Sequence, residues 1–380
     1  MQPLPLQSAS ARTPRMEVLD VIRGVTMILV VFHHVRGTTF GLYNSPSPLS
    51  EFLMSFRMPM FFFISGFVAY KAVDAWSWSF YGRRLWKKAM VELFPTAVFF
   101  GLFVGLTEWD WDFPGGYWFT VALFGMLAVY YTVSVVSRHL FPRYRMVLLM
   151  VVALAGYVSM LAFGIKDMPY LPSGRMLTYF PFFVTGVVCR RFSTRFLAAV
   201  IDRWVVTLLI LSGGTLVCLV HFKMAGSGIV ASIVSSLGSA AVMFSVFSAF
   251  YSRREYWKSG GRLSRALQFV GRRTLDVYMI HWFLLPRIPQ MRGLFYNTGN
   301  NILELAVIGG VALVVVGGCL LISGLIRTSP LLGHYLFGAA PVKKNKGIDM
   351  GSVEIVNAAG HVASGRSAVM RLLHLQKNMN

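Results

Sequence analysis

Residues 19–34 read LDVIRGVTMILVVFHH, an apolar run that contains one arginine and ends in two histidines. An α-helix needs about 20 predominantly apolar residues to cross a bilayer, and this run reaches that length with its flanking residues. No small-residue cleavage site follows it, which argues against a signal peptide. We therefore expect a retained membrane helix that carries ionisable side chains.

Apolar runs of similar length recur along the chain. Its 380 residues are 56% hydrophobic and only 13% charged, whereas soluble domains carry about 25% charged residues. This composition excludes a disordered chain, a secreted disulfide scaffold and an ordinary cytosolic enzyme. We predict an all-α fold, a polytopic integral membrane helical bundle with about ten transmembrane helices. The predicted spans are 18–37, 53–72, 88–107, 117–137, 146–164, 176–190, 204–222, 228–250, 269–286 and 303–326.

The basic residues predict the orientation of the bundle. The formal net charge is +21, from 36 Lys and Arg against 15 Asp and Glu. Most of the basic residues lie in alternate segments between the apolar runs, as the positive-inside rule expects of cytoplasmic loops. We therefore predict cytoplasmic N- and C-termini, the lipid bilayer as a partner, and no nucleic acid. The predicted parts are a cytoplasmic N-terminal segment, 1–15, a transmembrane domain, 16–337, and a mobile basic cytoplasmic tail, 338–380.

The first span contains three ionisable groups within reach of one another. Arg23 and His34 are 11 residues apart, close to three helical turns, so they share one helix face. Asp20 lies one turn before Arg23 and can pair with it. Either these groups are structural, as an interfacial ion pair and a histidine that hydrogen-bonds between helices, or they form a functional site. We favour a catalytic role for all three, because imidazole suits a general base near neutral pH.

The second span carries a further arginine. Residues 56–71 read FRMPMFFFISGFVAYK, in which Arg57 precedes a proline. Arg57 either anchors an anionic group or marks the membrane interface. The small pair Ser65–Gly66 permits close approach of another helix. His33, whose side chain projects about 100° from that of His34, is expected to be a supporting or structural group.

The ninth predicted span carries two more ionisable groups. Residues 271–283 read GRRTLDVYMIHWF. Asp276 and His281 lie about 140° apart around a regular helix and cannot pair with each other, but either could meet His34 across the bundle. Asp276 is also expected to pair with one of the arginines one turn before it, residues 272–273.

Together these segments resemble the acyltransferase type 3 membrane family, whose best-known members O-acetylate bacterial surface glycans. The arginine, the ten intervening residues and the histidine of the first span resemble the family's opening helix, and MPMFFFISGF resembles its second. GYWFTVALF, YFPFFVTG and LDVYMIHWF are similar to later helices, so the resemblance covers roughly residues 15–340. Tyr117 precedes Trp118 where the family usually has a histidine. The stretch RTSPLLGHYLFGAAPVKK is similar to the end of proteins that succinylate periplasmic glucans, which leaves the acyl group open.

The resemblance implies a membrane-embedded O-acyltransferase in the inner membrane of a bacterium. It would move an acyl group, acetyl first of all, from cytoplasmic acyl-CoA to a hydroxyl of an extracytoplasmic glycan or lipid-linked saccharide. His34 would be the general base and Arg23 an electrostatic and orienting group. The candidates for binding the acyl donor are basic residues, which attract its phosphates: Arg83, Arg84 and Arg57.

Several alternatives remain open at this point. Intramembrane Asp, Arg and His also suit a secondary transporter or flippase for a glycan or anionic solute, although we find no two related halves with interrupted helices. An acyltransferase acting on a small cytosolic metabolite or antibiotic would differ only in its acceptor. The carboxylate that orients His34 could be Glu51, Asp276 or Glu304. Three widely spaced cysteines form no metal motif, so we expect no metal and no bound cofactor, with acyl-CoA (acetyl-CoA first) as co-substrate.

Overall fold

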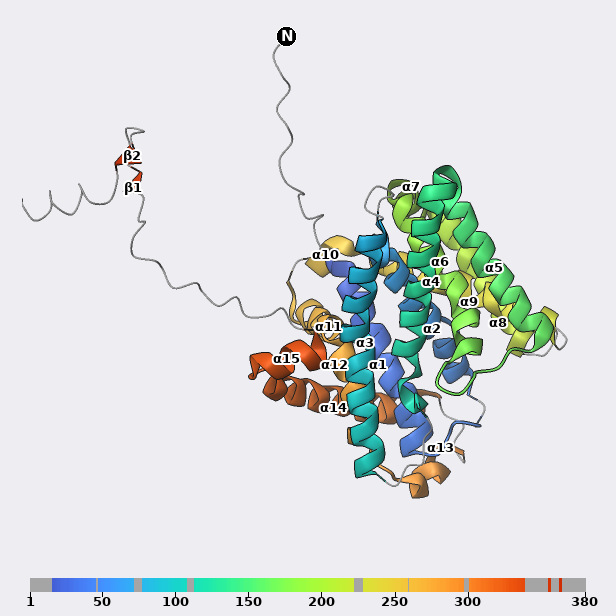
Figure 1. The fold of residues 1–380 in the computed structure, drawn as a ribbon. Helices are drawn as coiled ribbons and strands as arrows, with labels where there is room; N and C mark the ends of the chain where they lie inside the picture. The colour runs from blue at the N-terminus through green and yellow to red at the C-terminus, as the bar shows by residue number, and fades with distance from the viewer. Residues whose placement is uncertain are drawn as a thin grey trace, which may run out of the picture. The chain divides into compact units, whose positions relative to one another are not determined.

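The computed structural model of the chain is helical through its first unit (Figure 1). It describes residues 16–45, 47–71, 77–107, 113–221, 228–258, 260–296 and 301–338, and two short strands. The chain divides into two units, residues 1–339 and 340–380. In the second unit, β1 (Ile355–Val356) pairs with β2 (Val362–Ala363) in antiparallel orientation. The predicted segment 1–15 and nearly all of the tail 338–380 lie outside the described residues.

The described part of the first unit consists of helices joined by short connections. The longer ones are α1 (Glu17–His34), α2 (Pro48–Ala69), α3 (Trp78–Leu106), α4 (Trp118–Leu140), α5 (Arg145–Phe163), α6 (Ser173–Arg191), α8 (Arg203–His221), α9 (Ile229–Ser252), α11 (Arg262–Arg272), α12 (Thr274–Leu284) and α14 (Asn301–Ile326). The shorter ones are α7 (Ser193–Ala199), α10 (Arg254–Lys258), α13 (Gly293–Tyr296) and α15 (Pro330–Phe337). Single turns of other helix types are the π-helical η1 (Val35–Thr39) and the 3₁₀-helical η3 (Gly115–Tyr117), η4 (Pro142–Tyr144) and η5 (Pro289–Arg292).

Seven helices within the described ranges are long and apolar enough to cross a membrane, or eight if one bent pair is a single span. The bent pair is Ser193–Ala199 with Arg203–Cys218, at 74° to each other. The seven are Glu17–Thr39, Pro48–Ala69, Trp78–Leu106, Gly115–Leu140, Pro142–Phe163, Ile229–Ser252 and Asn301–Ile326. The predicted class, a polytopic helical membrane protein, is confirmed. The count of ten spans and the orientation stay predictions.

The ninth predicted span, 269–286, is not one straight helix. It is divided between α11, which ends at Arg272, and α12, which begins at Thr274. With 11 residues, α12 is about 16 Å long at 1.5 Å per residue, well short of a hydrocarbon core of about 30 Å. The break coincides with the basic pair Arg272–Arg273, which precedes the apolar part of this segment.

The helices α2 and α6 pack at backbone distance. A Cβ on Gly66 would overlap the carbonyl oxygen of Phe183, and a Cβ on Gly186 would overlap the carbonyl oxygen of Phe63. Small residues permit this approach between membrane helices, where tight van der Waals packing replaces the hydrophobic effect. The close approach expected at Ser65–Gly66 is therefore confirmed, and it places α2 in the middle of the bundle beside α6 (Figure 1).

The first half of α1 packs in the same manner against α11. A Cβ on Gly24 would meet the carbonyl oxygen of Leu267, and a Cβ on Gly271 would meet that of Asp20. The side chain of Asp20, 4% exposed, faces α11, where its Oδ2 lies 3.5 Å from Nε of Arg272. This contact gives Asp20 a partner on another helix that the sequence did not suggest.

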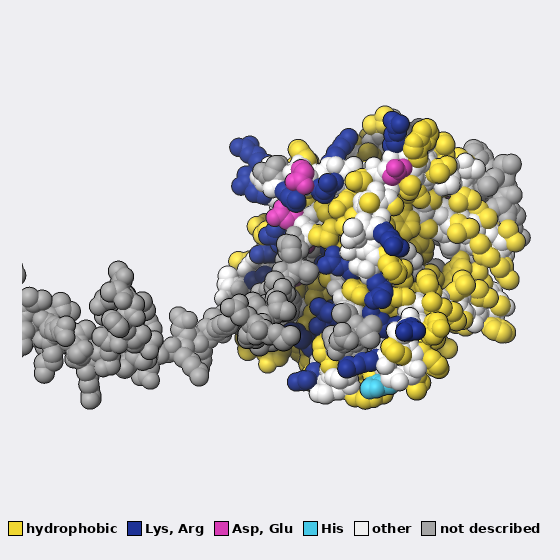
Figure 2. All heavy atoms as spheres, turned by 90° about the horizontal axis from the view of Figure 1, so that it is seen from above, with side chains coloured by type: hydrophobic (Ala, Val, Ile, Leu, Met, Phe, Trp, Pro, Cys, Tyr) yellow, Lys and Arg dark blue, Asp and Glu magenta, His cyan; other side chains and the backbone are white. Residues whose placement is uncertain are grey.

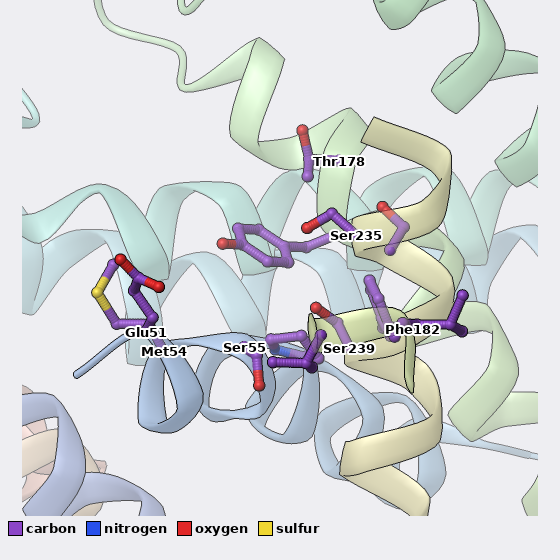
Figure 3. Close-up of a pocket in the computed structure, with 13 residues that line it drawn as sticks. Glu51, Met54, Ser55, Thr178, Phe182, Ser235 and Ser239 are labelled. Atoms are coloured by element: carbon purple, nitrogen blue, oxygen red, sulfur yellow. The ribbon is translucent and has the colours of Figure 1, made fainter. Parts of the chain in front are cut away.

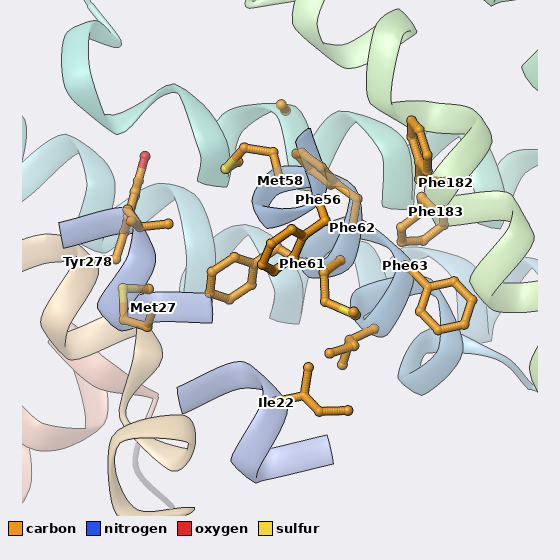
Figure 4. Close-up of a cluster of buried hydrophobic side chains, with 14 of the residues drawn as sticks. Ile22, Met27, Phe56, Met58, Phe61, Phe62, Phe63, Phe182, Phe183 and Tyr278 are labelled. Atoms are coloured by element: carbon orange, nitrogen blue, oxygen red, sulfur yellow. The ribbon is translucent and has the colours of Figure 1, made fainter. Parts of the chain in front are cut away.

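A cluster of buried side chains joins α1, α2, α6 and α12 (Figure 4). The three consecutive phenylalanines 61–63 of α2 are 4% exposed or less. Met27 of α1 and Tyr278 of α12 lie on one side of them, and residues 182–183 of α6 lie on the other (Figure 4). This packing fixes the positions of α1 and α12, which carry the ionisable groups of the predicted site.

The helix α3 begins at the end of the bundle that is uppermost in Figure 1. Figure 2 shows this face, with Lys and Arg spread over it and few Asp or Glu. Arg83 is exposed and Arg84 is half-buried, both in the first two turns of α3. A basic face at one end of a membrane bundle is typical of a cytoplasmic side.

Candidate active site

The end of α1 positions His34. The helix continues without interruption into the π-helical turn η1, a local conformation that is frequent at functional sites. Nδ1 of His34 lies 3.2 Å from Oη of Tyr43, and Oη of Tyr43 lies 2.9 Å from Oγ1 of Thr38. Partial burial raises the pKa of the Tyr43 hydroxyl above its ordinary value, so the hydroxyl stays protonated at neutral pH. Tyr43 is thus a hydrogen-bonding partner of His34.

An ion pair with α14 holds the loop that carries Tyr43. Nε of Arg36 donates to Oε1 of Glu304 at 2.7 Å, while its other nitrogens donate to the carbonyl oxygens of Leu42 and, at 2.8 Å, Ser45. The Arg36 and Glu304 side chains are 5% and 10% exposed. A buried ion pair with further hydrogen bonds on both partners is well satisfied, so it fixes the loop against α14.

Aromatic rings from α12 surround the imidazole of His34. The ring centroids of His281 and Trp282 lie 5.2 Å and 4.3 Å from that of His34, and the His33 ring lies at 5.3 Å. His281 is fully buried, and its Nδ1 lies 2.8 Å from the carbonyl oxygen of Tyr278. Because Nδ1 donates there, Nε2 carries the lone pair, and it has no hydrogen-bond partner within the described part of the chain. Asp276 and His281 were the two possible neighbours of His34 on this helix, and His281 is the one that lies beside it in the structure.

The other group, Asp276, faces α14 instead. Its carboxylate accepts hydrogen bonds from Nε of Arg327 at 2.7 Å, from Nη2 of Arg327 at 3.0 Å, and from the hydroxyl of Ser323. The expected pairing with the arginines at 272–273 is therefore wrong. The reason is geometric: Arg272 lies across the break, on α11, and pairs with Asp20. A two-pronged arginine–carboxylate pair is also the stronger arrangement for a buried acid.

The three carboxylates considered as partners of His34 all lie elsewhere. Glu304 binds Arg36 and, at 2.9 Å, the hydroxyl of Ser47. Asp276 is held by Arg327, and Glu51 lines a different cavity. The hydrogen-bond partner that the structure gives to His34 is a phenol, Tyr43.

His34 lines a cavity of about 240 Å³ between α1, α2, α4, α6 and α12, called the histidine cavity below. Its polar lining comes from His33, His34, Arg57, Arg175 and the aromatic side chains Trp118 and Tyr278. No Asp or Glu is among the described residues that line it. His33, expected to point elsewhere, therefore shares this cavity with His34.

The two arginines of the histidine cavity are held differently. Arg175 pairs with Asp167, Nε to Oδ2 at 2.9 Å, and its guanidinium carbon lies 4.8 Å from the ring centroid of Trp118. Arg57 is only 7% exposed, and its Nε and Nη1 have no hydrogen-bond partner within the described residues. From the sequence, Arg57 was a candidate for binding the acyl donor together with Arg83 and Arg84. In the structure Arg57 lines the same cavity as His34, whereas Arg83 and Arg84 lie near the start of α3.

A second cavity of about 180 Å³ adjoins the first and contains Arg23; it is called the arginine cavity below. Lys88 and Glu92 of α3 also line it, with Nζ of Lys88 3.0 Å from Oε1 of Glu92. The side chains that line both cavities, and so separate them, are those of Met27, Phe61, Phe119 and Tyr278. Arg23 and His34 thus occupy neighbouring cavities on the two sides of this apolar and aromatic partition.

A larger cavity of about 360 Å³ lies between α2, α6, α8 and α9 (Figure 3). Its polar groups are Glu51 and hydroxyls, among them Ser55, Thr178, Ser235 and Ser239, and its lining contains no His, Cys, Lys or Arg. Among the described residues that line it, the one candidate for a general base is therefore the carboxylate of Glu51. The rings of Tyr179, which lines this cavity, and Trp118, which lines the histidine cavity, stack at 6.2 Å.

Several residues of the site escaped the sequence analysis. Trp282 was visible beside His281, but nothing indicated that its ring would contact His34. Tyr43 lies in a connection without a periodic pattern. In the sequence, Arg175 is one charged residue of a loop and Glu92 is an isolated acidic residue. Only the packing of distant segments brings these groups together.

Comparison with known proteins assigns the family. Residues 16–324 match the acyltransferase 3 family, described as an acyltransferase domain. No curated protein matches the chain, and no solved structure does. The family match covers most of the chain and includes the histidine cavity and the arginine cavity described above. It confirms the resemblance expected from the sequence, and we conclude that the chain belongs to the acyltransferase 3 family and is a multi-pass membrane acyltransferase.

Proposed function

We propose that this enzyme moves an acyl group, acetyl in the first instance, from cytoplasmic acyl-CoA to a hydroxyl of an extracytoplasmic glycan or lipid-linked saccharide. The observation that carries the proposal is the histidine cavity, in which a half-buried imidazole adjoins a second cavity lined by Arg23. The membrane would be the inner membrane of a bacterium. A transporter or flippase is disfavoured because the chain is an acyltransferase by family.

His34 acts in this proposal as the general base. With Nδ1 protonated and donating to Tyr43, Nε2 carries the lone pair that accepts the proton of the acceptor hydroxyl. The hydroxyl oxygen attacks the thioester carbonyl carbon, the bond from that carbon to sulfur breaks, and the thiolate of CoA leaves. The proton held by His34 then passes to the thiolate, which restores the neutral imidazole.

In this proposal the arginine cavity receives the part of the donor arm that lies behind the thioester, and the thioester itself reaches His34 in the histidine cavity. Arg23 and Lys88 supply positive charge in the arginine cavity. The ion pair between Asp20 and Arg272 of α11 holds in place the turn of α1 that carries Arg23. Arg84 lies eight residues before Glu92 on the same helix, about 12 Å away at 1.5 Å per residue. Together with Arg83, it attracts the phosphates of CoA to the basic face shown in Figure 2.

The experiment uses the purified full chain in lipid vesicles with acetyl-CoA. We expect release of free thiol that depends on an added bacterial glycan fragment, and one acetyl ester formed on the glycan per thiol released. Thiol release that requires only a small soluble metabolite would overturn the glycan acceptor. Solute uptake without thiol release would instead favour a transporter.

Reporter fusions test the sides of the membrane. A fusion after Gly164 should read outside and one after Lys346 inside, because the basic residues predict cytoplasmic termini. The reverse result would place the donor and acceptor entrances on the wrong sides.

A further inference from the structure

Arg57 is a buried cation without a partner in the described structure. It lies within α2, 7% exposed, and Nε and Nη1 make no hydrogen bond with described residues. Removing a guanidinium from water is expensive unless an anion and hydrogen-bond acceptors replace the water. Arg36 and Arg327 obey that rule through their pairs with Glu304 and Asp276. The buried Arg145 does not pair with a carboxylate in the described structure, but it donates to the carbonyl oxygen of Lys71 and lies over the ring of Tyr70.

Among the described residues that line the histidine cavity with Arg57, none carries a negative charge that could neutralise it. The described lining of the histidine cavity has no carboxylate, and Nδ1 of His33 in the same lining is also buried without a partner. Arg175 is already neutralised by Asp167. The histidine cavity therefore carries an unbalanced positive charge beside the proposed base.

The size of the cavity restricts which anion could enter. At about 240 Å³, it is smaller than typical drug-sized pockets of about 300–1,000 Å³, so it holds the reacting groups and not a nucleotide. The phosphates of CoA lie at the far end of a long arm from the thioester. Two sources remain, namely a carboxylate at the end of the acyl group, as in a dicarboxylic acyl-CoA, or a carboxylate or phosphate on the acceptor sugar.

We propose that Arg57 is the anion-binding residue of the histidine cavity, and that it binds an acidic group carried by one of the two substrates next to the reacting atoms. This inference rests on the proposed acyl transfer, whose substrate class it narrows. The unused nitrogens donate charge-assisted hydrogen bonds to the acidic group. An acetyl group on a neutral sugar would leave Arg57 unpaired.

The kinetic test compares Arg57→Gln with the wild type on matched substrates. One arm compares succinyl-CoA with acetyl-CoA on a neutral glucan, and the other compares a uronate-containing or phosphorylated glycan with a neutral one, using acetyl-CoA. We expect Arg57→Gln to lower kcat/KM about 10- to 100-fold for the acidic substrate and less than about threefold for its neutral counterpart. The arm that responds identifies the source of the anion. Arg143→Gln, which removes an exposed arginine, is the control and should change neither arm.

A binding test separates this inference from the proposed function, and its first readout uses the wild-type protein alone. Succinate and glucuronate are the probes, with acetamide and glucose as neutral controls. We expect the acidic probes, and not the neutral ones, to slow carbethoxylation of His34 by diethyl pyrocarbonate, read by mass spectrometry. This protection should persist in Arg57→Lys and be lost in Arg57→Gln.

Two results would overturn the anion site. Equal loss of kcat in Arg57→Gln for neutral and acidic substrates would make Arg57 a stabiliser of the transition-state oxyanion. Absence of charge-selective protection would show that the cavity has no preference for an acid. If the wild type transferred no acyl group but the acidic probes still protected His34, the proposed function would fail and the anion site would stand.

Discussion

The histidine cavity and the arginine cavity adjoin along α1, yet they differ in how their charges are balanced. In the arginine cavity, Lys88 faces a carboxylate at 3.0 Å. In the histidine cavity no described lining residue is acidic, and the buried Arg57 has two unsatisfied nitrogens. The difference indicates two tasks. One cavity has its own carboxylate, that of Glu92, beside the cations Arg23 and Lys88 and is suited to holding the donor arm. The other has no carboxylate among its described lining residues until an acidic substrate enters.

The partition between them supports this division. The Met27, Phe61, Phe119 and Tyr278 side chains line both cavities and belong to four different helices. They form a mostly apolar boundary between the two ionisable sets, and its polar group, the Tyr278 hydroxyl, donates to the carbonyl oxygen of Gly116 at 3.0 Å. Each variant described next changes one region of the molecule, and the measurement shows whether the function of the other region changes as well.

The largest effect is expected at His34. His34→Gln keeps hydrogen-bonding capacity but loses the titratable nitrogen, so kcat should fall about 10²- to 10⁴-fold. His33→Gln is the matched control, one residue away in the same cavity, and should retain turnover within about threefold. Turnover with acetyl-CoA measures both. Near wild-type activity of His34→Gln, or complete loss in His33→Gln alone, would reverse the assignment.

The next effect concerns stability and not chemistry. Asp276→Asn removes the charge that pairs with Arg327 at 2.7 Å, with the Asp276 side chain only 2% exposed. Breaking this pair leaves the guanidinium of Arg327, whose side chain is 24% exposed, without its counter-ion. It should cost about 1–3 kcal/mol, measured by thermal unfolding in detergent. Glu255→Gln, which breaks an exposed pair with Lys258, should cost about 0–1 kcal/mol. Equal losses would mean that α12 is not held by this pair.

A smaller effect is expected at Tyr43. Tyr43→Phe removes the hydroxyl that lies 3.2 Å from Nδ1 of His34 and keeps the ring. One hydrogen bond contributes about 0.5–1.5 kcal/mol, so kcat should fall about 2- to 12-fold while the KM for acyl-CoA stays unchanged. Thr38→Val, which removes the other partner of this hydroxyl, should have a weaker effect on kcat. A change in the KM alone would mean that Tyr43 takes no part in the chemical step.

The smallest effect is expected at the entrance. Arg83→Ala combined with Arg84→Ala should raise the KM for acyl-CoA about two- to tenfold, and less at high ionic strength, because exposed charges are screened by salt. kcat and acceptor dependence should not change. Arg143→Ala removes an exposed charge elsewhere and is the control. Unchanged kinetics with acyl-CoA would mean that Arg83 and Arg84 contribute only to the orientation of the protein in the membrane.

The helix pattern and the spacing of the motifs predicted much of the fold and part of the candidate site. The 11-residue interval from Arg23 to His34 placed both on one side of α1, and Ser65–Gly66 predicted the close approach of α2 to a neighbour. These features depend on the period of a single helix, which is visible in the sequence.

The partners across helices could not be predicted in this way. Asp276 pairs with Arg327, 51 residues further along, whereas sequence spacing suggests only partners one turn away. The break between α11 and α12 falls at the basic pair Arg272–Arg273, inside the segment predicted as one span. Tyr43 reaches His34 because Arg36 and Glu304, 268 residues apart, fix its loop. Each of these contacts depends on which helices become neighbours.

The division between the two cavities is tested most directly by measuring acyl-CoA binding and turnover in the same two variants. His34→Gln should bind acetyl-CoA with the wild-type dissociation constant and form almost no product. Arg23→Gln, on the other side of the partition, should bind acetyl-CoA more weakly and retain measurable turnover at saturating donor. If instead His34→Gln lost donor binding, or both variants showed the same defect, the two cavities would not have separate tasks.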